Sequence, residues 1–377
     1  METTILVAGD ICPIGRNQDL FASGDRAGLL GDLSPIFYAA SLVVANLECP
    51  LIEKQSPIRK SGRNIGCPVQ CVGGLKAMGV DIAGLANNHI MDHGKAGLRT
   101  TLRVLRDAGI TAVGAGNNAE DAAKIVTTQN GSLTIGVLAV AEREFSIASK
   151  DTSGANPCDP IDFVKTVRKH KNTFEYLLVL LHGGIEYYPF PSPRLQKLCR
   201  FMIEEGANAV ICQHSHCPGC YEQYQHGHIV YGQGNFLFDL DARKKQHWNQ
   251  GFLVGLRVQK ERTADAFFIP YLQSFLQAGA RRMAPKEEES FLNDLETRSR
   301  LILDDGFVCD TWRAFCASKR DTYLSTLRGH RRLVRALNKL THFTNWQYSR
   351  DALTTLENVV RCESHLEVLN TILSDFA

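Results

Sequence analysis

Short apolar runs separated by helix-length segments organise the first two thirds of the chain. The segments Gly94–Ala108 and Pro193–Glu205 have the length and spacing of helices. Strands that are apolar throughout and alternate with helices are typical of a sheet covered on both faces. We therefore predict an α/β fold containing the strands Ile5–Ala8, Leu42–Ala45, Asp81–Ala86, Thr111–Val113, Thr134–Val140, Leu177–Leu181 and Ala209–Cys212.

The pattern changes twice further along the chain. Three apolar runs without clear helices between them predict a second sheet of mixed or antiparallel strands. These runs are Ile229–Tyr231, Phe252–Val258 and Ala266–Ile269. From about residue 275 helical spacing dominates, and apolar residues recur at intervals of three to six along one stripe. The stripe consists of Leu353, Leu356, Val360, Leu366, Leu369 and Leu373.

Charges also separate in this last part of the chain. Residues 287–310 are rich in acids, whereas residues 313–340 are rich in bases. One interpretation is two helices whose opposite faces attract each other, or simply solvated surfaces. The other is that a basic group meets an anionic partner or substrate. That group consists of Arg328, Arg331, Arg332 and Arg335.

Composition narrows the classes of protein. The 377 residues are 44% hydrophobic and 22% charged, which is ordinary for a folded domain. A net charge of +2 argues against a nucleic-acid binder, and no apolar run approaches the ~20 residues of a membrane span. Residues 1–10 lack the basic start of a signal peptide and look like a buried strand, so we expect a cytoplasmic protein.

The number of cysteines does not by itself indicate a catalytic or metal-binding role. Twelve cysteines in a chain without a secretion signal are expected to be mostly reduced thiols. Cys217 and Cys220 form a C-x-x-C pair, but no second pair at zinc-site spacing accompanies them. Structural thiols are therefore favoured here over a redox or zinc site.

Polar side chains that follow predicted strands carry the strongest functional signal. Eight of the twelve histidines lie between His89 and His228. In α/β proteins the carboxyl ends of strands are where ligands bind, so we expect these groups at one edge of the sheet. Five segments have this placement: Gly9-Asp10, Asn46-Leu47-Glu48, Asn87-Asn88-His89, His182-Gly183-Gly184 and His214-Ser215-His216.

The type of side chain predicts a metal centre. In an extended segment, His214 and His216 would face the same side and contact one metal or two adjacent ones. Carboxylate, amide and imidazole groups suit Mn, Fe, Zn or Co. Six or more such groups exceed the needs of one tetrahedral zinc, so two metals are expected. Paired metals typically serve hydrolysis at phosphorus or at a carbonyl.

The order of these motifs resembles the calcineurin-like metallophosphoesterase superfamily. More narrowly, the sequence resembles the bacterial capsule-synthesis family of the CapA, poly-γ-glutamate type over roughly residues 3–275. The segments that carry the resemblance are GDICPIGR (9–16), ANLECPL (45–51), GLANNHIMDHGKAGL (84–98), VGAGNNAEDA (113–122), LHGGIEYYPFPSP (181–193), GANAVICQHSHCPG (206–219) and YGQGNF (231–236).

The resemblance implies a fold and a domain organisation. The fold would be a four-layer α/β/β/α sandwich with the site at the strand ends. Residues 1–278 would form this domain, and residues 279–377 would form a helical C-terminal extension outside the core match.

The resemblance also implies a role for each metal ligand. Asp10 and His216 would hold one divalent ion, and Glu48 would bridge, where the wider superfamily usually has Asp. The second ion would be held by Asn88, His182 and His214. The superfamily begins Asp-x-His, but here the third position is Cys12. Cys12 is either a thiolate ligand, which would favour zinc or iron, or a bystander.

Other residues would act on the substrate. By the same resemblance His89 would not be a ligand but a general acid or electrostatic stabiliser over the substrate. Arg16 and Asn17 are candidates to bind substrate anions. Glu186 and Tyr187 are expected to line the pocket.

Three functions follow from this sequence. The first is a metal-dependent hydrolase that acts on a phosphoester, or on an amide-like linkage, in capsule, poly-γ-glutamate or cell-envelope polysaccharide production. The second is a weakly catalytic or non-catalytic metal-binding partner of a polymer synthase, which would use the helical extension for docking. The third is a nucleotide-directed phosphodiesterase.

Overall fold

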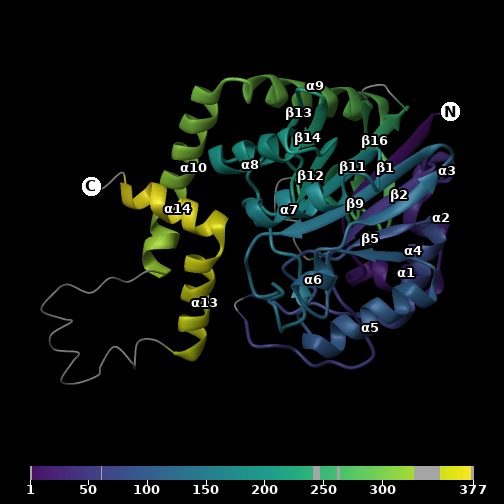
Figure 1. Cartoon of the computed structure of the whole chain (residues 1–377), viewed down its shortest axis with the longest axis horizontal. Coiled ribbons are helices and arrows are strands. Elements are labelled where there is room, and N and C mark those ends of the chain that lie inside the picture. Colours follow the sequence, from purple (N-terminus) through teal and green to yellow (C-terminus); the bar gives the residue numbers. More distant parts are fainter. Residues whose placement is uncertain (1, 61, 241–246, 261–263, 327–348, 375–377) are drawn as a thin grey trace, which may run out of the picture.

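Two β-sheets lie face to face, with helices on both outer sides (Figure 1). The computed structural model describes residues 2–60, 62–240, 247–260, 264–326 and 349–374. Each of the seven strands predicted in the first two thirds of the chain is present, so the α/β class is confirmed.

The first sheet is mixed, with β1 at its centre. In spatial order it contains β18 (Ala280–Arg282), β17 (Asp265–Gln273), β16 (Gln250–Val258), β1 (Thr3–Cys12), β2 (Leu42–Leu47), β5 (Ile82–Gly84) and β6 (Thr111–Val113). Strands β1, β2, β5 and β6 are parallel, whereas β16 to β18 continue the sheet antiparallel. A short strand, β15 (Asn235–Phe238), also pairs with β1, parallel to it.

The second sheet has six strands. In spatial order these are β13 (Tyr221–Tyr224), β14 (Gly227–Val230), β12 (Ala209–Gln213), β11 (Tyr176–His182), β9 (Leu133–Ala141) and β8 (Val126–Asn130). Two small ribbons complete the strands: β3 (Leu51–Ile52) with β4 (Cys67–Pro68), and β7 (Ala115–Gly116) with β10 (Gly154–Ala155).

One prediction about the sheets is wrong. The three runs after residue 228 do not form a sheet of their own. Strand β14 joins the second sheet, whereas β16 and β17 extend the first sheet. Apolar character reports that a strand is buried, but it does not identify the neighbour with which that strand pairs.

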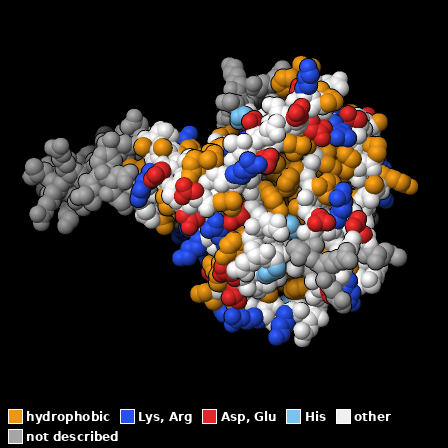
Figure 2. All heavy atoms as spheres, turned by 90° about the horizontal axis from the view of Figure 1, so that it is seen from above, with side chains coloured by type: hydrophobic (Ala, Val, Ile, Leu, Met, Phe, Trp, Pro, Cys, Tyr) orange, Lys and Arg blue, Asp and Glu red, His pale blue; other side chains and the backbone are white. Residues whose placement is uncertain are grey.

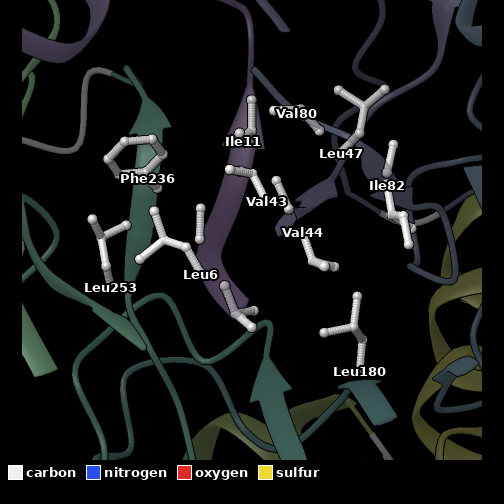
Figure 3. Close-up of a cluster of buried hydrophobic side chains, with 14 of the residues drawn as sticks. Leu6, Ile11, Val43, Val44, Leu47, Val80, Ile82, Leu180, Phe236 and Leu253 are labelled. Carbon is white, nitrogen blue, oxygen red and sulfur yellow. The ribbon is translucent and has the colours of Figure 1, made fainter. Parts of the chain in front are cut away.

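The core lies between the two sheets. Figure 3 shows Leu180 of β11 pointing from the second sheet toward Val44 and Ile82 of the first. A Cβ atom added to Gly84 would lie 2.8 Å from Cδ1 of Leu180, so a larger residue there would require the Leu180 side chain to move. Alternate residues of β11 face outward, where Leu177, Val179 and Leu181 join a separate cluster under the helices.

Helices cover both outer faces and give the four layers. Side chains of the first five helices pack in the cluster of the first sheet. Those of α7, α8 and α10 cover the second sheet. Their bounds are α1 (Gln18–Ser23), α2 (Arg26–Leu30), α3 (Ser34–Ala39), α4 (Val72–Met78), α5 (Gly94–Asp107), α6 (Ala119–Ala122), α7 (Pro160–His170), α8 (Pro193–Glu204), α9 (Pro285–Leu301), α10 (Asp305–Thr326), α13 (Arg350–Arg361) and α14 (Glu363–Ser374).

The C-terminal helices wrap around one end of the sandwich (Figure 1). Strand β18 precedes α9 and still belongs to the first sheet, so the expected boundary at residue 278 falls just before the last strand. Helix α9 runs across the top in that figure, and Figure 2, seen from above, shows acidic and basic side chains interspersed on this face. The acids of α9 pair locally, as Glu288 does with Arg282.

The apolar stripe of the last segment is broken. The chain divides at Cys362 into α13 and α14, and Leu353 and Val360 are 50% and 46% exposed. Of the stripe, Leu369 is buried, and the other buried apolar residues of this segment are Val359, Cys362, Val368 and Ile372. The basic group Arg328, Arg331, Arg332 and Arg335 lies outside the described residues.

None of the helices in the described ranges combines the length and the apolar character that crossing a bilayer requires. The cytoplasmic location stays a prediction.

Candidate metal centre

The predicted ligands come together where strands of both sheets end. Asp10 lies in β1 and Glu48 directly follows β2, both in the first sheet. His182 is the last residue of β11, and His214 directly follows β12, both in the second sheet. The expectation of a single sheet edge is therefore wrong, because the cluster occupies the joint between two facing sheets.

The register of β1 places two amides beside Asp10. Its partners across the sheet are Asn46 of β2 and Asn235 of β15. Asn46 donates a hydrogen bond of 2.7 Å to Oδ1 of Asp10, and the backbone N–H of His214 donates one of 3.0 Å to Oδ2. Asn235 Oδ1 lies 2.8 Å from Nδ1 of His216. These contacts fix the carboxylate and one imidazole in place.

Glu48 lies at the centre of the cluster. Its Oε1 is 3.6 Å from Nε2 of His182 and 3.7 Å from Nε2 of His216. Glu48 is fully buried, and neither of its carboxylate oxygens has a hydrogen-bond partner. A buried carboxylate without a partner is costly unless a cation accompanies it.

His214 and His216 lie close to Glu48 because the backbone bends there, which the sequence did not indicate. Both have positive φ angles, 91° and 52°, so the segment is a bend and not the extended strand that we expected. Positive φ is rare for residues with a Cβ and marks strain that the surroundings must hold. Glu48, His214 and His216 nevertheless form a group whose ligand atoms lie within 4.8 Å of one another.

Asn88 and His182 complete the set. Asn88 Oδ1 lies 3.1 Å from Nε2 of His182, and the rings of His182 and His214 are 4.8 Å apart between centroids. Nδ1 of His214 is a further buried atom without a hydrogen-bond partner. Oxygen and imidazole donors converge here around unpaired buried atoms, so these residues fit divalent metal ions of the Mn, Fe or Zn type.

Burial dominates the ionisation of this cluster. It raises the pKa of Glu48 well above the usual value, and the nearby carboxylates of Asp10 and Glu186 raise it further. Burial lowers the pKa of His182, and the neighbouring imidazoles lower it further. Burial also lowers the pKa of His216, although the carboxylates of Glu186 and Asp10 oppose this effect. Neutral imidazole is the form that binds metals.

His89 is held beside the cluster by two charged residues. Its Nδ1 lies 2.6 Å from Oδ2 of Asp92 and 3.2 Å from Nζ of Lys60. Asp92 is fully buried, pairs with Lys60 through its other oxygen and accepts the N–H of Ile65. The imidazole is thus fixed at Nδ1, which leaves Nε2 as the ring nitrogen that Asp92 does not engage.

A cavity of about 670 Å³ opens over the cluster. His89, Glu186 and Tyr187 line it, so the last two lie where the sequence placed them. Aromatic side chains form part of the wall, with Trp248 5.0 Å from the ring of His216. The C-terminal helices add further lining residues: Phe315, Lys319, Asn358 and His365.

Arg16 and Asn17 have structural partners instead. Arg16 forms a two-point ion pair with Asp239, with contacts of 2.8 and 2.9 Å. Asn17 is buried, donates to the side chain of Ser274 and accepts the N–H of Gly279. Neither residue lines the cavity, and this arrangement gives no support to their expected role in binding substrate anions.

The structure groups Cys12 with other thiols. Cys12, Cys49 and Cys67 are buried with their sulfur atoms within 4.8 Å of one another, and 3.1 Å separates the last two. Burial opposes ionisation of Cys67, but hydrogen bonds from Cys12 and Cys49 outweigh it and lower the pKa of Cys67 to about 5. Cys217 and Cys220 are free, buried thiols.

Several residues of the site escaped the sequence analysis. Lys60 comes from a loop without any pattern, and Trp248 comes from a distant part of the chain. Asn235 lies in the motif YGQGNF, but no role was expected for it. Asp92 had a usable signal, since it follows His89 by three residues in the same turn.

Fold and site together define a class: an α/β/β/α sandwich with carboxylate, amide and imidazole groups gathered at the strand ends. Within that class the chain belongs to the family described as bacterial capsule synthesis protein PGA_cap, whose model matches residues 4–240. The resemblance of the motifs to the capsule-synthesis family is thereby confirmed.

Relatives and a solved structure add detail. The chain is 27% identical over 351 residues to the capsule biosynthesis protein CapA of Bacillus anthracis, covering 90% of this chain and 80% of the relative. It is 33% identical over 213 residues to the PGA biosynthesis protein CapA of Bacillus subtilis, covering 55% and 56%. A putative 5'-nucleotidase from Staphylococcus aureus matches with 14% identity and a TM-score of 0.44, covering 79% of this chain and 58% of that one.

Proposed function

We propose that this protein is a hydrolase that depends on two divalent metal ions and acts on a phosphoester. The observation that carries the proposal is the burial of Glu48 without hydrogen bonds to either carboxylate oxygen. Five other side chains of kinds that bind metals surround it. Asp10 and His216 would hold one ion, Asn88, His182 and His214 the other, with Glu48 between them. The ions would be Mn, Fe or Zn, and would supply Lewis acidity and lower the pKa of a water at the reaction centre.

The protein's own groups would then orient the substrate and move a proton. His89 lines the cavity and is fixed at Nδ1 by Asp92, so its Nε2 would donate a proton to the leaving group or stabilise charge on the reacting phosphoryl group. Arg63, Lys319 and Lys60 are basic residues of the cavity lining and favour an anionic substrate. Glu186 and Tyr187, in the loop after β11, would contact the substrate from another part of the cavity wall.

The relatives suggest the process. Both Bacillus proteins carry names of capsule or PGA biosynthesis, and we propose that this chain acts in the same kind of polymer production. The substrate would be a phosphoester, or less favourably an amide-like linkage, of a cell-envelope precursor or polymer.

Metal content tests the centre directly. Elemental analysis of protein purified without chelators or a His-tag should find at least two equivalents of Mn, Fe or Zn. Asp10→Ala and His214→Ala should lose metal, whereas His226→Ala, at an exposed turn, should keep it. A protein that stays metal-free after reconstitution, yet remains folded, would overturn the proposal.

The position of Cys12 supports a second candidate function. Cys12 lies beside the thiols of Cys49 and Cys67. The first ion would therefore have only three protein ligands, Asp10, His216 and Glu48. Such a site suits a weakly catalytic partner of a polymer synthase, with the C-terminal helices as its docking surface. His89→Ala distinguishes the two, because full biological function in a folded, metal-loaded variant would exclude catalysis. If the protein hydrolysed cyclic nucleotides or dinucleotides, the third function, a nucleotide-directed phosphodiesterase, would be favoured instead.

A further inference from the structure

A second group of metal-type side chains lies beside the cavity, and the C-terminal helices complete it. Glu144 comes from the loop after β9, whereas Cys362 and His365 come from the start of α14. Their ligand atoms lie within 4.8 Å of one another. Two of the three residues lie beyond residue 240, where the family match ends.

The sulfur of Cys362 is held in a defined position. Cys362 is 2% exposed and directly precedes α14. Ser364 and His365 follow it in the first turn of α14, where backbone N–H groups have no partner within the helix. Such groups favour a thiolate, but burial and the carboxylates of Glu142 and Glu144 outweigh them and raise the pKa of the Cys362 thiol.

Among the described carboxylates around this group, Glu144 is the one that no Lys or Arg side chain pairs with. Glu142 pairs with Arg194, and Glu363 pairs with Arg143. Among the described residues Glu144 has no such Lys or Arg partner, and its contact is with Nε2 of His214 at 3.9 Å. An acidic loop, a buried sulfur and an imidazole thus meet where a divalent cation would balance the charge.

We propose that Glu144, Cys362 and His365 form a third cation site, separate from the two-metal centre, which takes Zn²⁺ and fastens the C-terminal helices to the wall of the cavity. One carboxylate, one thiolate and one imidazole are ligands that zinc accepts together, with a fourth position left open. Glu144 and His365 line the cavity, so that position faces it.

The present geometry requires little movement. In a tetrahedral zinc site the ligand atoms lie about 3.3–3.8 Å apart. Because the atoms here lie within 4.8 Å of one another, each pair has to contract by at most about 1.5 Å. Burial and the neighbouring Glu142 and Glu144 raise the pKa of the Cys362 thiol, so zinc binding should release a proton. The site does not depend on the proposed hydrolase activity.

Cobalt substitution tests the site, because the main centre offers no thiolate. The full chain, stripped with chelator and loaded with Co²⁺, should show the near-ultraviolet charge-transfer absorption of a cobalt–thiolate bond. Cys362→Ser should lose this absorption, whereas Asp10→Asn should keep it. Cys49→Ser is the matched control, since it removes a buried thiol of the other cluster.

Two results would overturn the site. One is the absence of the thiolate absorption in the folded wild type. The other is its loss in Cys49→Ser and its retention in Cys362→Ser, which would assign the cobalt to the thiol cluster. If Cys362→Ser does not fold, Glu144→Gln takes its place, because Glu144 lies on a loop.

Elemental analysis and hydrogen exchange separate this site from the proposed function. Cys362→Ser should lose one equivalent of zinc that the Asp10→Ala and His214→Ala variants keep. Zinc should slow amide exchange across residues 350–374 in the wild type and not in Cys362→Ser. Equal exchange with and without zinc in the wild type would show that the ion does not fasten the helices.

Discussion

Asp92 holds His89 through a contact of 2.6 Å between its Oδ2 and Nδ1 of the imidazole. The carboxylate is fully buried and also pairs with Lys60. A buried carboxylate on one ring nitrogen fixes the orientation of the ring and frees the other nitrogen for proton transfer. Asp92 is therefore a positioning residue for the proposed general acid.

The first prediction follows from this pair. His89→Ala should lower kcat on an activated aryl phosphoester by about 100- to 10,000-fold, the usual contribution of general acid catalysis. Asp92→Asn should lower kcat by about 10- to 100-fold, because the ring loses its fixed orientation. KM and metal content should stay unchanged in both variants. A loss of metal in Asp92→Asn would show that its role is structural.

The second prediction concerns Glu48 in chelator-treated protein. Its pKa is raised in the folded state, so the folded protein keeps the proton at pH values where the unfolded chain has released it. The contribution of Glu48 to the free energy of unfolding is therefore complete below the unfolded pKa of about 4.3. As the pH rises from there toward the folded pKa, the free energy of unfolding falls by about 1.4 kcal/mol per pH unit. Glu48→Gln removes this loss.

Urea unfolding from pH 4 to pH 8 measures the effect. The metal-free Glu48→Gln variant should become more stable than the metal-free wild type, and the gap should widen with pH. With metal present the order should reverse, because the variant loses a ligand. Parallel stability curves in chelator would contradict the assignment of Glu48 as a buried, uncompensated carboxylate.

The third prediction concerns Cys12. Because its sulfur lies among the thiols of Cys49 and Cys67, Cys12→Ala should leave the metal content unchanged. It should lower the free energy of unfolding by about 1–2 kcal/mol, the cost of a small buried cavity. Elemental analysis with thermal unfolding checks both parts. The loss of one equivalent of metal would instead make Cys12 a ligand.

The fourth prediction concerns the attachment of the C-terminal helices. Arg194 pairs with Glu142 of the core and with Glu367 of α14. Arg194→Met would leave the buried Glu142 and the half-buried Glu367 without their cation. This should lower the free energy of unfolding by about 2–3 kcal/mol, less than for a fully buried pair because the Arg194 side chain is 34% exposed. Amide exchange should rise across residues 350–374 while β1 and β2 stay protected. Arg313→Met, on an exposed pair of α10, is the control.

The sequence predicts the strands and the metal-type side chains because both depend on local composition. Leu177–Leu181 is apolar on both faces, and this is enough to mark a buried strand. The pairing of β16 with β1 and the contact of Arg16 with Asp239 depend on residues more than 200 positions apart, which no periodicity encodes. The bend at His214 also escaped, because tertiary contacts override the local preference against positive φ.

Strand β1 has β2 on one side and β15 and β16 on the other, so its neighbours are separated by about 200 residues of chain. During synthesis, a chain that has emerged only as far as His216 already contains all six proposed metal ligands, yet β1 is still an open edge because β15 and β16 have not been made. Pairing at such sequence separation is slow to form. An arrested or truncated chain would therefore present an apolar strand edge, where aggregation begins, in place of a finished centre.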